Sequence, residues 1–133
     1  MIYVTDTHPL LFVTTDRTER LGKRARRIFQ ATEKGQHSII VPIIVLEEVA
    51  RLVEKGVVKL NVPFRRWAET LEGSPNYHIQ PYTIEILLES LSLRAIRDPA
   101  DRAIVATARY SGYPLITKDE IIRDGDWVEA VWD

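Results

Sequence analysis

The sequence predicts an α/β fold, namely a three-layer α/β/α sandwich in which helices cover both faces of a mainly parallel central sheet. Two observations support this prediction. Short apolar segments alternate with longer amphipathic segments along the chain, which is the order expected of βαβ units. The short segments are also continuously apolar rather than alternating, as is typical of strands that are buried on both faces.

In the N-terminal half, Pro9 is expected to open the first helix, because proline is favoured in a first turn. Residues 19–34 predict a second helix, since apolar side chains recur on one face and Gly35 follows the end. Pro42 begins a third helix that runs to about Lys55 and stops at Gly56. The strands expected in this half cover residues 1–6 and 38–41.

In the C-terminal half, residues 62–73 predict a helix with an apolar face that includes Trp67 and Leu71. Asp98 and Pro99 begin a further helix that Gly112 ends. One more helix is expected over residues 83–93. The strands expected in this half cover residues 78–81, 114–119 and 128–132.

Length and composition narrow the possible classes of protein. A chain of 133 residues with 45% hydrophobic residues is expected to form a single domain spanning 1–133. The absence of cysteine excludes disulfides, thiolate zinc sites, iron–sulfur clusters and cysteine nucleophiles. No apolar run is long enough to span a membrane, and the N-terminus lacks the pattern of a signal peptide. We therefore expect a soluble, cytoplasmic protein.

The charge is unevenly spread along a chain whose net charge is only −1. Residues 16–27 contain six basic and two acidic residues, and three arginines surround the Asp98–Asp101 segment: Arg94, Arg97 and Arg102. Basic residues on one helix more often form a solvated face than a nucleic-acid footprint. This pattern is therefore compatible with an RNA partner but does not by itself indicate one.

Acidic residues are expected to converge at one edge of the sheet. Asp6 and Asp119 each follow a predicted strand, and ligands of open parallel sheets bind at the carboxyl ends of the strands. Asp101 lies in the first turn of the helix that leads to the Asp119 strand. The separation of 18 positions from Asp101 to Asp119 suffices for a helix down the sheet and a strand back up.

The adjacent glutamates Glu47 and Glu48 are separated by helical periodicity. Glu48 shares its face with Ile44 and Leu52, whereas Glu47 lies with charged neighbours such as Arg51. An ionised carboxylate on an apolar face needs a partner. Glu48 is therefore the candidate for the acidic cluster.

Each acid also has a purely structural interpretation. Asp6, Asp98, Asp101 and Asp119 can cap or begin helices or turns, and Glu48 can pair with Arg97 or Arg102. Four carboxylates that converge from separate elements would, however, repel one another strongly unless a cation were bound. Their convergence favours a metal site.

Four segments in this order resemble the PIN-domain family, most closely its VapC-type toxins: "YVTDTHPLL", "IIVLEEVARLVEKG", "DPADRAIVATA" and "LITKDE". The resemblance covers essentially the whole chain. It implies an α/β/α sandwich whose rim of three or four acids binds Mg²⁺ or Mn²⁺ and cleaves RNA. Carried over by residue, it implies that Asp6, Glu48, Asp101 and Asp119 form the acidic cluster, with Thr117 as a polar neighbour.

The resemblance also assigns finer roles. The acid that leads directly into the small-residue helix is the ligand, which is Asp101 here, and Asp98 is then the cap. Glu47 remains a rival to Glu48 because the motif allows a slip of one residue. Oxygen ligands without sulfur favour Mg²⁺ or Mn²⁺, and Asp6 and Asp101 are the first candidates for direct contact. His8 is a further candidate for contact with the substrate.

The expected function is that of a metal-dependent endoribonuclease, acting as a toxin with a cognate antitoxin and forming a homodimer. Two alternatives remain within the family, an RNA-processing nuclease that is not a toxin and a catalytically silent binding module. A signalling receiver domain also places acids at the rim of a parallel sheet. It needs an adjacent acid pair after the first strand, where "VTDTHP" offers one acid, and a phosphoacceptor after the third, where "HIQP" offers none.

Overall fold

The computed structural model describes residues 1–133 and confirms the predicted fold class. Five strands form one sheet in the order β3-β2-β1-β4-β5, and every neighbouring pair is parallel. The strands are β1 (Ile2–Thr5), β2 (Ser38–Pro42), β3 (Tyr77–Gln80), β4 (Leu115–Ile116) and β5 (Ala130–Val131). The chain builds the sheet outward from β1 through β2 to β3 at one edge, and then returns to place β4 on the other side of β1. This reversal makes a switch point between β1 and β4, where ligand sites of such sheets form.

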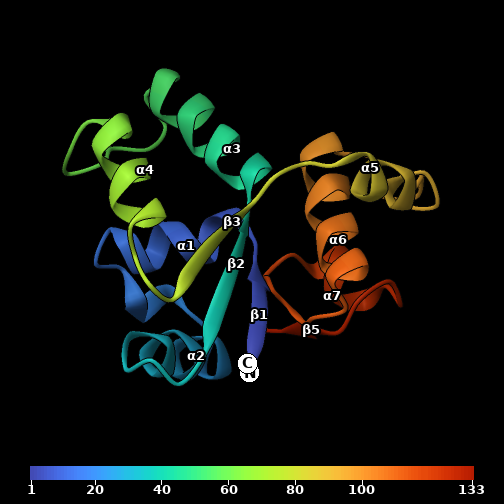
Figure 1. Cartoon of the computed structure of the whole chain (residues 1–133), viewed down its shortest axis with the longest axis horizontal. Coiled ribbons are helices and arrows are strands. Elements are labelled where there is room, and N and C mark those ends of the chain that lie inside the picture. The colour runs from blue at the N-terminus through green and yellow to red at the C-terminus, as the bar shows by residue number, and fades with distance from the viewer.

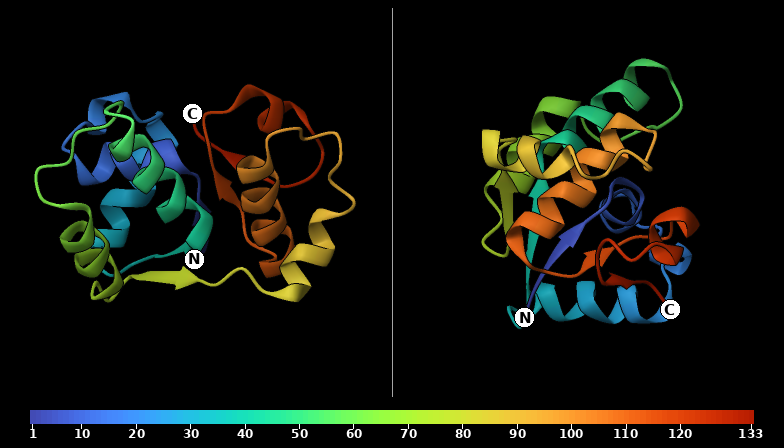
Figure 2. Two further views of the ribbon diagram at one scale, coloured as in Figure 1. Left: turned by 90° about the horizontal axis from the view of Figure 1, so that it is seen from above. Right: turned by 90° about the vertical axis from the view of Figure 1, so that its right-hand side faces the viewer.

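Helices cover both faces of this sheet (Figures 1 and 2). One layer contains α1 (Thr7–Thr14), α2 (Lys23–Glu33) and α4 (Phe64–Glu72). The other contains α5 (Ile84–Ser90), α6 (Pro99–Ser111) and α7 (Glu120–Asp124). Helix α3 (Ile43–Glu54) follows β2 without a loop and stands at the carboxyl end of the sheet, where it contacts both α1 and α6.

The predicted helix over residues 19–34 is wrong as a single element. It is divided into a short 3-10 helix, η1 (Thr18–Arg20), and α2, with Leu21 extended between them. The C-terminal segment explains the break, because the Trp132 carbonyl accepts a hydrogen bond of 3.0 Å from the Ala25 N–H. A Cβ at Gly22 would lie 2.2 Å from that carbonyl oxygen. The chain can approach α2 there only at a glycine.

Two smaller expectations also need correction. Helix α1 begins at Thr7, with Asp6 as its N-cap, so Pro9 lies within the first turn rather than at its start. Strand β4 ends at Ile116 instead of continuing to Asp119. Asp119 is the N-cap of α7 and accepts a hydrogen bond of 3.1 Å from the Ile122 N–H. A capping carboxylate requires the chain to leave the ladder before it, which shortens the strand.

The sheet and the inner helix faces enclose one hydrophobic core of 27 buried residues. Helix α6 contributes Ile104, Val105 and Ala106, each at 0% exposure. This packing fixes the rotation of α6 about its axis and thereby the direction in which its first turn points. None of the helices has the length and apolar character needed to cross a bilayer.

Candidate metal centre

Asp6 is held rigidly where β1 passes into α1. Its N–H donates to the Ile116 carbonyl of the neighbouring strand at 3.0 Å. One carboxylate oxygen, Oδ1, accepts from the Thr7 N–H at 2.7 Å, and the other, Oδ2, accepts from the Thr117 hydroxyl at 2.7 Å. Only 7% of the residue is exposed. Both oxygens are therefore oriented by the fold before any ligand arrives.

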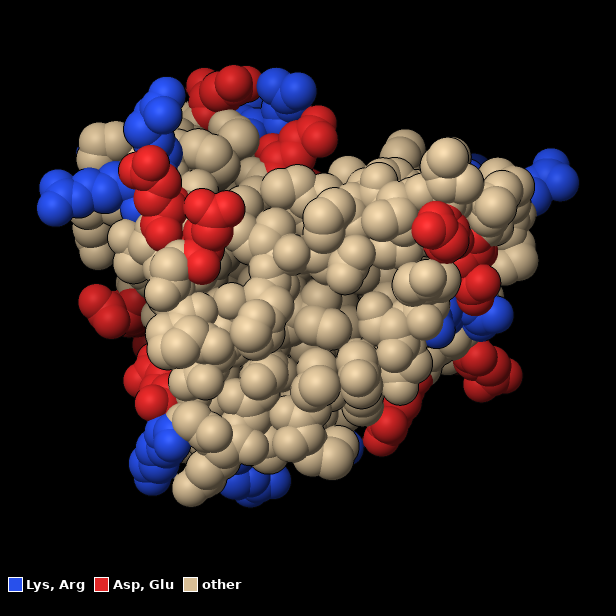
Figure 3. All heavy atoms as spheres, in the orientation of Figure 1, with Lys and Arg blue, Asp and Glu red and all other residues tan.

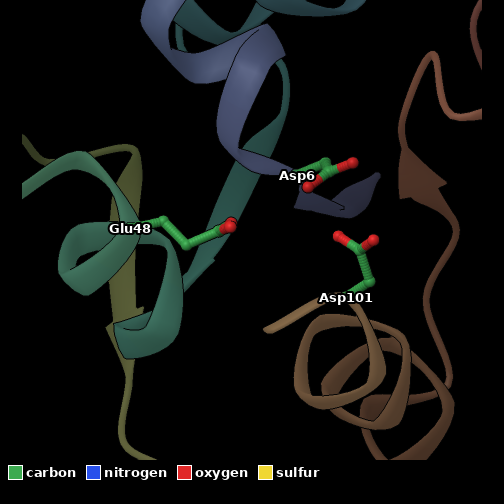
Figure 4. Close-up of side chains that lie close together, drawn as sticks. All are labelled: Asp6, Glu48 and Asp101. Carbon is green, nitrogen blue, oxygen red and sulfur yellow. The ribbon is translucent and has the colours of Figure 1, made fainter. Parts of the chain in front are cut away.

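Glu48 reaches the same point from α3. The hydroxyl of Thr7 donates a hydrogen bond to its Oε1 atom, and the side chain extends toward Asp6 (Figure 4). Glu47, the alternative to Glu48 for the acidic cluster, is exposed, and its carboxylate lies 3.5 Å from the Arg51 guanidinium. The structural alternative of an ion pair with Arg102 is not observed. The Arg102 Nε atom donates instead to the Ile96 carbonyl at 2.9 Å.

Asp101 enters from the opposite layer, in the first turn of α6. Asp98 caps that helix through hydrogen bonds from the Ala100 and Asp101 N–H groups, at 2.9 and 3.1 Å. The Asp101 carboxylate faces Asp6 across the sheet edge (Figure 4). One carboxylate oxygen from each of Asp6, Glu48 and Asp101 lies within 4.8 Å of those of the other two.

Asp119 lines the same cleft but lies outside this close group of three. The cleft has a volume of about 540 Å³, and Asp6, Glu48, Asp98, Asp101 and Asp119 are among its lining residues. Thr117, which is fully buried, links Asp119 to the cluster: its Oγ1 atom accepts from the Asp119 N–H at 3.1 Å while donating to Asp6. Asp119 thus combines its capping role with a place in the cleft wall.

The electrostatics of the cluster show why it fits a cation. Burial raises the pKa values of Asp6 and Glu48, against the opposing effect of their hydrogen bonds from Thr117 and Thr7. Burial, followed by the charges of Asp6, Asp98, Asp119 and Glu48, raises the pKa of Asp101 to about 7. No ion pair joins Asp6, Glu48 or Asp101 to a basic side chain. Three oxygen donors with no compensating charge suit a divalent cation that prefers oxygen ligands.

Two residues of the site were missed from the sequence. Thr7 contacts two of the acids, since its N–H donates to Asp6 and its hydroxyl to Glu48. Its position directly after Asp6, at the start of a helix, is the only sequence signal for this role. Lys118 lies between Thr117 and Asp119 in the sequence and also lines the cleft. The sequence pattern indicated only its two neighbours. His8 lines the cleft as well and is exposed.

A cluster of one buried and two half-buried carboxylates at the carboxyl edge of a parallel α/β sheet defines a candidate divalent-metal site. The family model that describes the PIN domain matches residues 3–128. The chain therefore belongs to the PIN-domain family, whose members are generally nucleases. A search among curated proteins gave no match.

Solved structures support the fold. The chain is similar to a structure of VapBC2 from Rickettsia felis bound to a promoter DNA fragment, with a TM-score of 0.73, 16% identity and 100% coverage of both chains. It is also similar to FitAcB from Neisseria gonorrhoeae, with a TM-score of 0.65, 17% identity and coverage of 98% and 96%. A toxin–antitoxin complex from Klebsiella pneumoniae gives 0.62, 20% identity and coverage of 97% and 95%.

Proposed function

We propose that this PIN domain is a divalent-metal-dependent endoribonuclease, a phosphodiester hydrolase. The observation that carries the proposal is the meeting of Asp6, Glu48 and Asp101 from three elements within 4.8 Å. No basic side chain of the protein neutralises them. Such a cluster is costly to fold unless it binds a cation, which makes a structural role alone a poor explanation.

Asp6 and Asp101 would hold Mg²⁺ or Mn²⁺ directly, and Glu48 and Asp119 would complete the site or act through water. When bound, the cation supplies charge for a phosphate oxygen and lowers the pKa of an attacking water. The chain's own residues prepare the site. Thr7 and Thr117 fix the carboxylates of Glu48 and Asp6 by donating hydrogen bonds, which preserves their orientation at little entropic cost.

The Asp101 carboxyl group also makes the site sensitive to pH. With its pKa raised to about 7, it can hold or release a proton at the Oδ atoms that face the cleft near neutral pH. A bound cation would bring this pKa down again, so proton uptake and metal binding compete at Asp101. Activity should therefore decline as the pH falls below neutrality.

The direct test is RNA cleavage with purified protein, with and without Mg²⁺ or Mn²⁺, for the wild type and Asp101→Asn. We expect cleavage by the wild type only with metal, and a loss of at least about 100-fold in the variant because it removes a ligand. Asp124→Asn, an exposed acid at the end of α7 outside the cleft, is the matched control and should keep wild-type activity. Equal cleavage by wild type and Asp101→Asn would exclude the proposal.

We also propose that the protein is the toxin of a toxin–antitoxin pair and acts on RNA in the cytoplasm. Support comes from the likeness of the chain to two solved structures, VapBC2 from Rickettsia felis and the toxin–antitoxin complex from Klebsiella pneumoniae. Expression of the wild type should arrest growth, Asp101→Asn should not, and the product of an adjacent small gene should restore growth. Metal-dependent cleavage without growth arrest would instead favour the RNA-processing alternative, and absence of metal binding would favour the silent module.

We also propose that the chain forms a single domain. One continuous core of 27 residues supports a single domain over 1–133.

We further propose that the protein forms a homodimer through an apolar face. Ile84, Leu88 and Leu91 project from one face of α5 at 71%, 58% and 61% exposure. The molecular face shown in Figure 3 has few charged side chains over its centre, where Figure 1 places the unpaired edge strand β3. An exposed apolar helix face such as that of α5 is typical of an interface.

A further inference from the structure

A second groove adjoins the acidic cleft and differs from it in charge. The groove has a volume of about 200 Å³ and is lined by side chains from α1, from the segment after α1 and from the segment after α3. Its basic lining residues are Arg17, Arg20 and Lys59, and it has no Asp or Glu in its lining. We refer to it as the basic groove. An acid-free groove is notable in a chain whose net charge is −1.

The cations of the basic groove are free to bind an external anion. Arg17, Arg20 and Lys59 are exposed, and none of them forms an ion pair with an acidic side chain. Two other basic residues of the 16–27 segment are already engaged. Arg24 lies 4.0 Å from Glu129, and the Arg26 Nε atom donates to the Thr18 carbonyl at 3.1 Å.

The basic groove and the acidic cleft are adjacent and share one lining residue. His8 lines both, and its exposed ring lies at their junction. Phe12, which lines the basic groove, lies near a cation of each depression: the Lys118 Nζ atom lies 5.2 Å from its ring centroid and the Arg20 Cζ atom lies 6.0 Å from it. Lys118 also lines the acidic cleft. Cation–π contacts with one aromatic ring thus hold a cation on each side of the boundary.

We propose that the basic groove binds the phosphates of single-stranded RNA next to the phosphate that lies at the acidic cluster. This inference rests on the proposed ribonuclease activity and adds the path of the substrate. A strand that brings one phosphate to the carboxylates is repelled by them, and the adjoining cations compensate for that repulsion. The exposed His8 ring at the junction offers a surface on which an unstacked base can lie, which favours single-stranded over duplex RNA.

The binding test uses the full chain carrying Asp101→Asn, so that RNA remains intact, and a fluorescent single-stranded RNA of about 12 nucleotides. Arg20→Gln with Lys59→Gln should weaken binding by about tenfold and reduce the slope of log K against log salt by about 1.4, since each phosphate contact contributes about 0.7. Arg65→Gln with Arg66→Gln, two exposed arginines of α4 outside the groove, should change affinity less than about twofold.

Two further variants separate charge from folding. Arg20→Lys with Lys59→Arg keeps the charges and should retain wild-type affinity. Arg17→Gln with Lys59→Gln leaves both Phe12 contacts intact and should lose affinity as the Arg20 variant does. In protein with an intact acidic cluster, the groove variants should raise KM by about tenfold while kcat stays within about twofold, because they remove binding but not chemistry.

The outcomes distinguish this inference from the proposed activity. Wild-type protein that cuts no RNA would refute the proposed ribonuclease activity. The binding of the fluorescent RNA, followed by its anisotropy, would still show whether the basic groove binds RNA. Groove variants that bind like the α4 control, or that lose kcat rather than affinity, would refute the RNA path alone. Duplex RNA that binds as tightly as single-stranded RNA would also overturn the inference. So would groove variants that lose affinity for an acidic peptide but keep their affinity for RNA.

Discussion

At the scale of single residues, Thr117 connects two acids that come from different ends of the chain. Its side chain is 0% exposed, donates to Asp6 and accepts from the Asp119 N–H. Thr117→Val has nearly the same shape but leaves both partners unpaired, so we expect the free energy of unfolding to fall by about 1–3 kcal/mol. Thr117→Ser keeps the hydroxyl and is the control. Urea denaturation of metal-free protein measures both, and equal losses in the two variants would contradict the prediction.

Asp101 should make the stability of the metal-free protein depend on pH. Its pKa in the folded protein is about 7, above the ordinary 3.8, so the folded state retains a proton that the unfolded state releases. Stability from this group is therefore complete below pH 3.8 and is lost as the pH rises toward 7. Thermal denaturation in EDTA should show this decline, and Asp101→Asn should flatten it. A steeper decline in the variant would contradict the assigned pKa direction.

Added metal should reverse this dependence, because a cation binds the ionised carboxylates and competes with protons. At a concentration tenfold above its dissociation constant, Mg²⁺ or Mn²⁺ should stabilise the wild type by about 1.4 kcal/mol. The rise in Tm should be larger at pH 8 than at pH 5. Asp101→Asn should show a smaller rise at both values, while a rise independent of pH would mean that the metal binds elsewhere.

The acids of the site were predictable from the sequence to different degrees. Helical periodicity alone separates Glu48 from Glu47, and the position of Asp101 after a capping Asp98 predicts its place in a first turn. The roles of Thr7 and Lys118 were not predictable in this way. Thr7 donates to a glutamate 41 positions further along the chain, and no local pattern encodes a contact that depends on how α3 packs against α1.

At the scale of elements, α6 positions Asp101 through its cap and its packing. Asp98→Ala removes the side-chain acceptor for the Ala100 and Asp101 N–H groups and should cost about 1 kcal/mol of stability. Asp98→Asn keeps the acceptor while removing the charge. Comparison of these two variants isolates the cap, because both relieve the repulsion that Asp98 exerts on Asp101. Equal unfolding free energies for the two would show that the cap contributes nothing.

Two other elements differ from what apolar patterning predicts. Periodicity over residues 19–34 predicted one helix because the apolar face continues through Leu21, Ala25 and Ile28, all of them buried. The division into η1 and α2 depends on the Trp132 carbonyl approaching Gly22. Strand β4 is likewise shortened by the capping role of Asp119. Both differences arise from long-range contacts or from a competing local hydrogen bond that apolar patterning does not report.

At the scale of the whole molecule, the fold separates charges that nearly cancel in the sum. The acidic cleft and the basic groove meet at His8, although the net charge of −1 gave no indication of either. The sheet order explains the acidic side, because Asp6 follows β1 and Thr117 follows β4 at the switch point. The groove is assembled from segments on either side of α2 in the sequence, so its charge could not be predicted from any one helix.

The exposed apolar face of α5 should determine the oligomeric state. Ile84, Leu88 and Leu91 recur at helical spacing and face outward, while α5 packs its other side against α6. A symmetric dimer would bury this face against its copy. Leu88→Glu would place facing carboxylates in that interface and should shift the mass in light scattering from dimer to monomer. Val57→Glu, at a residue that is 69% exposed but distant in sequence from α5, should leave the mass unchanged. A monomeric wild type, or a dimer that persists in Leu88→Glu, would exclude this interface.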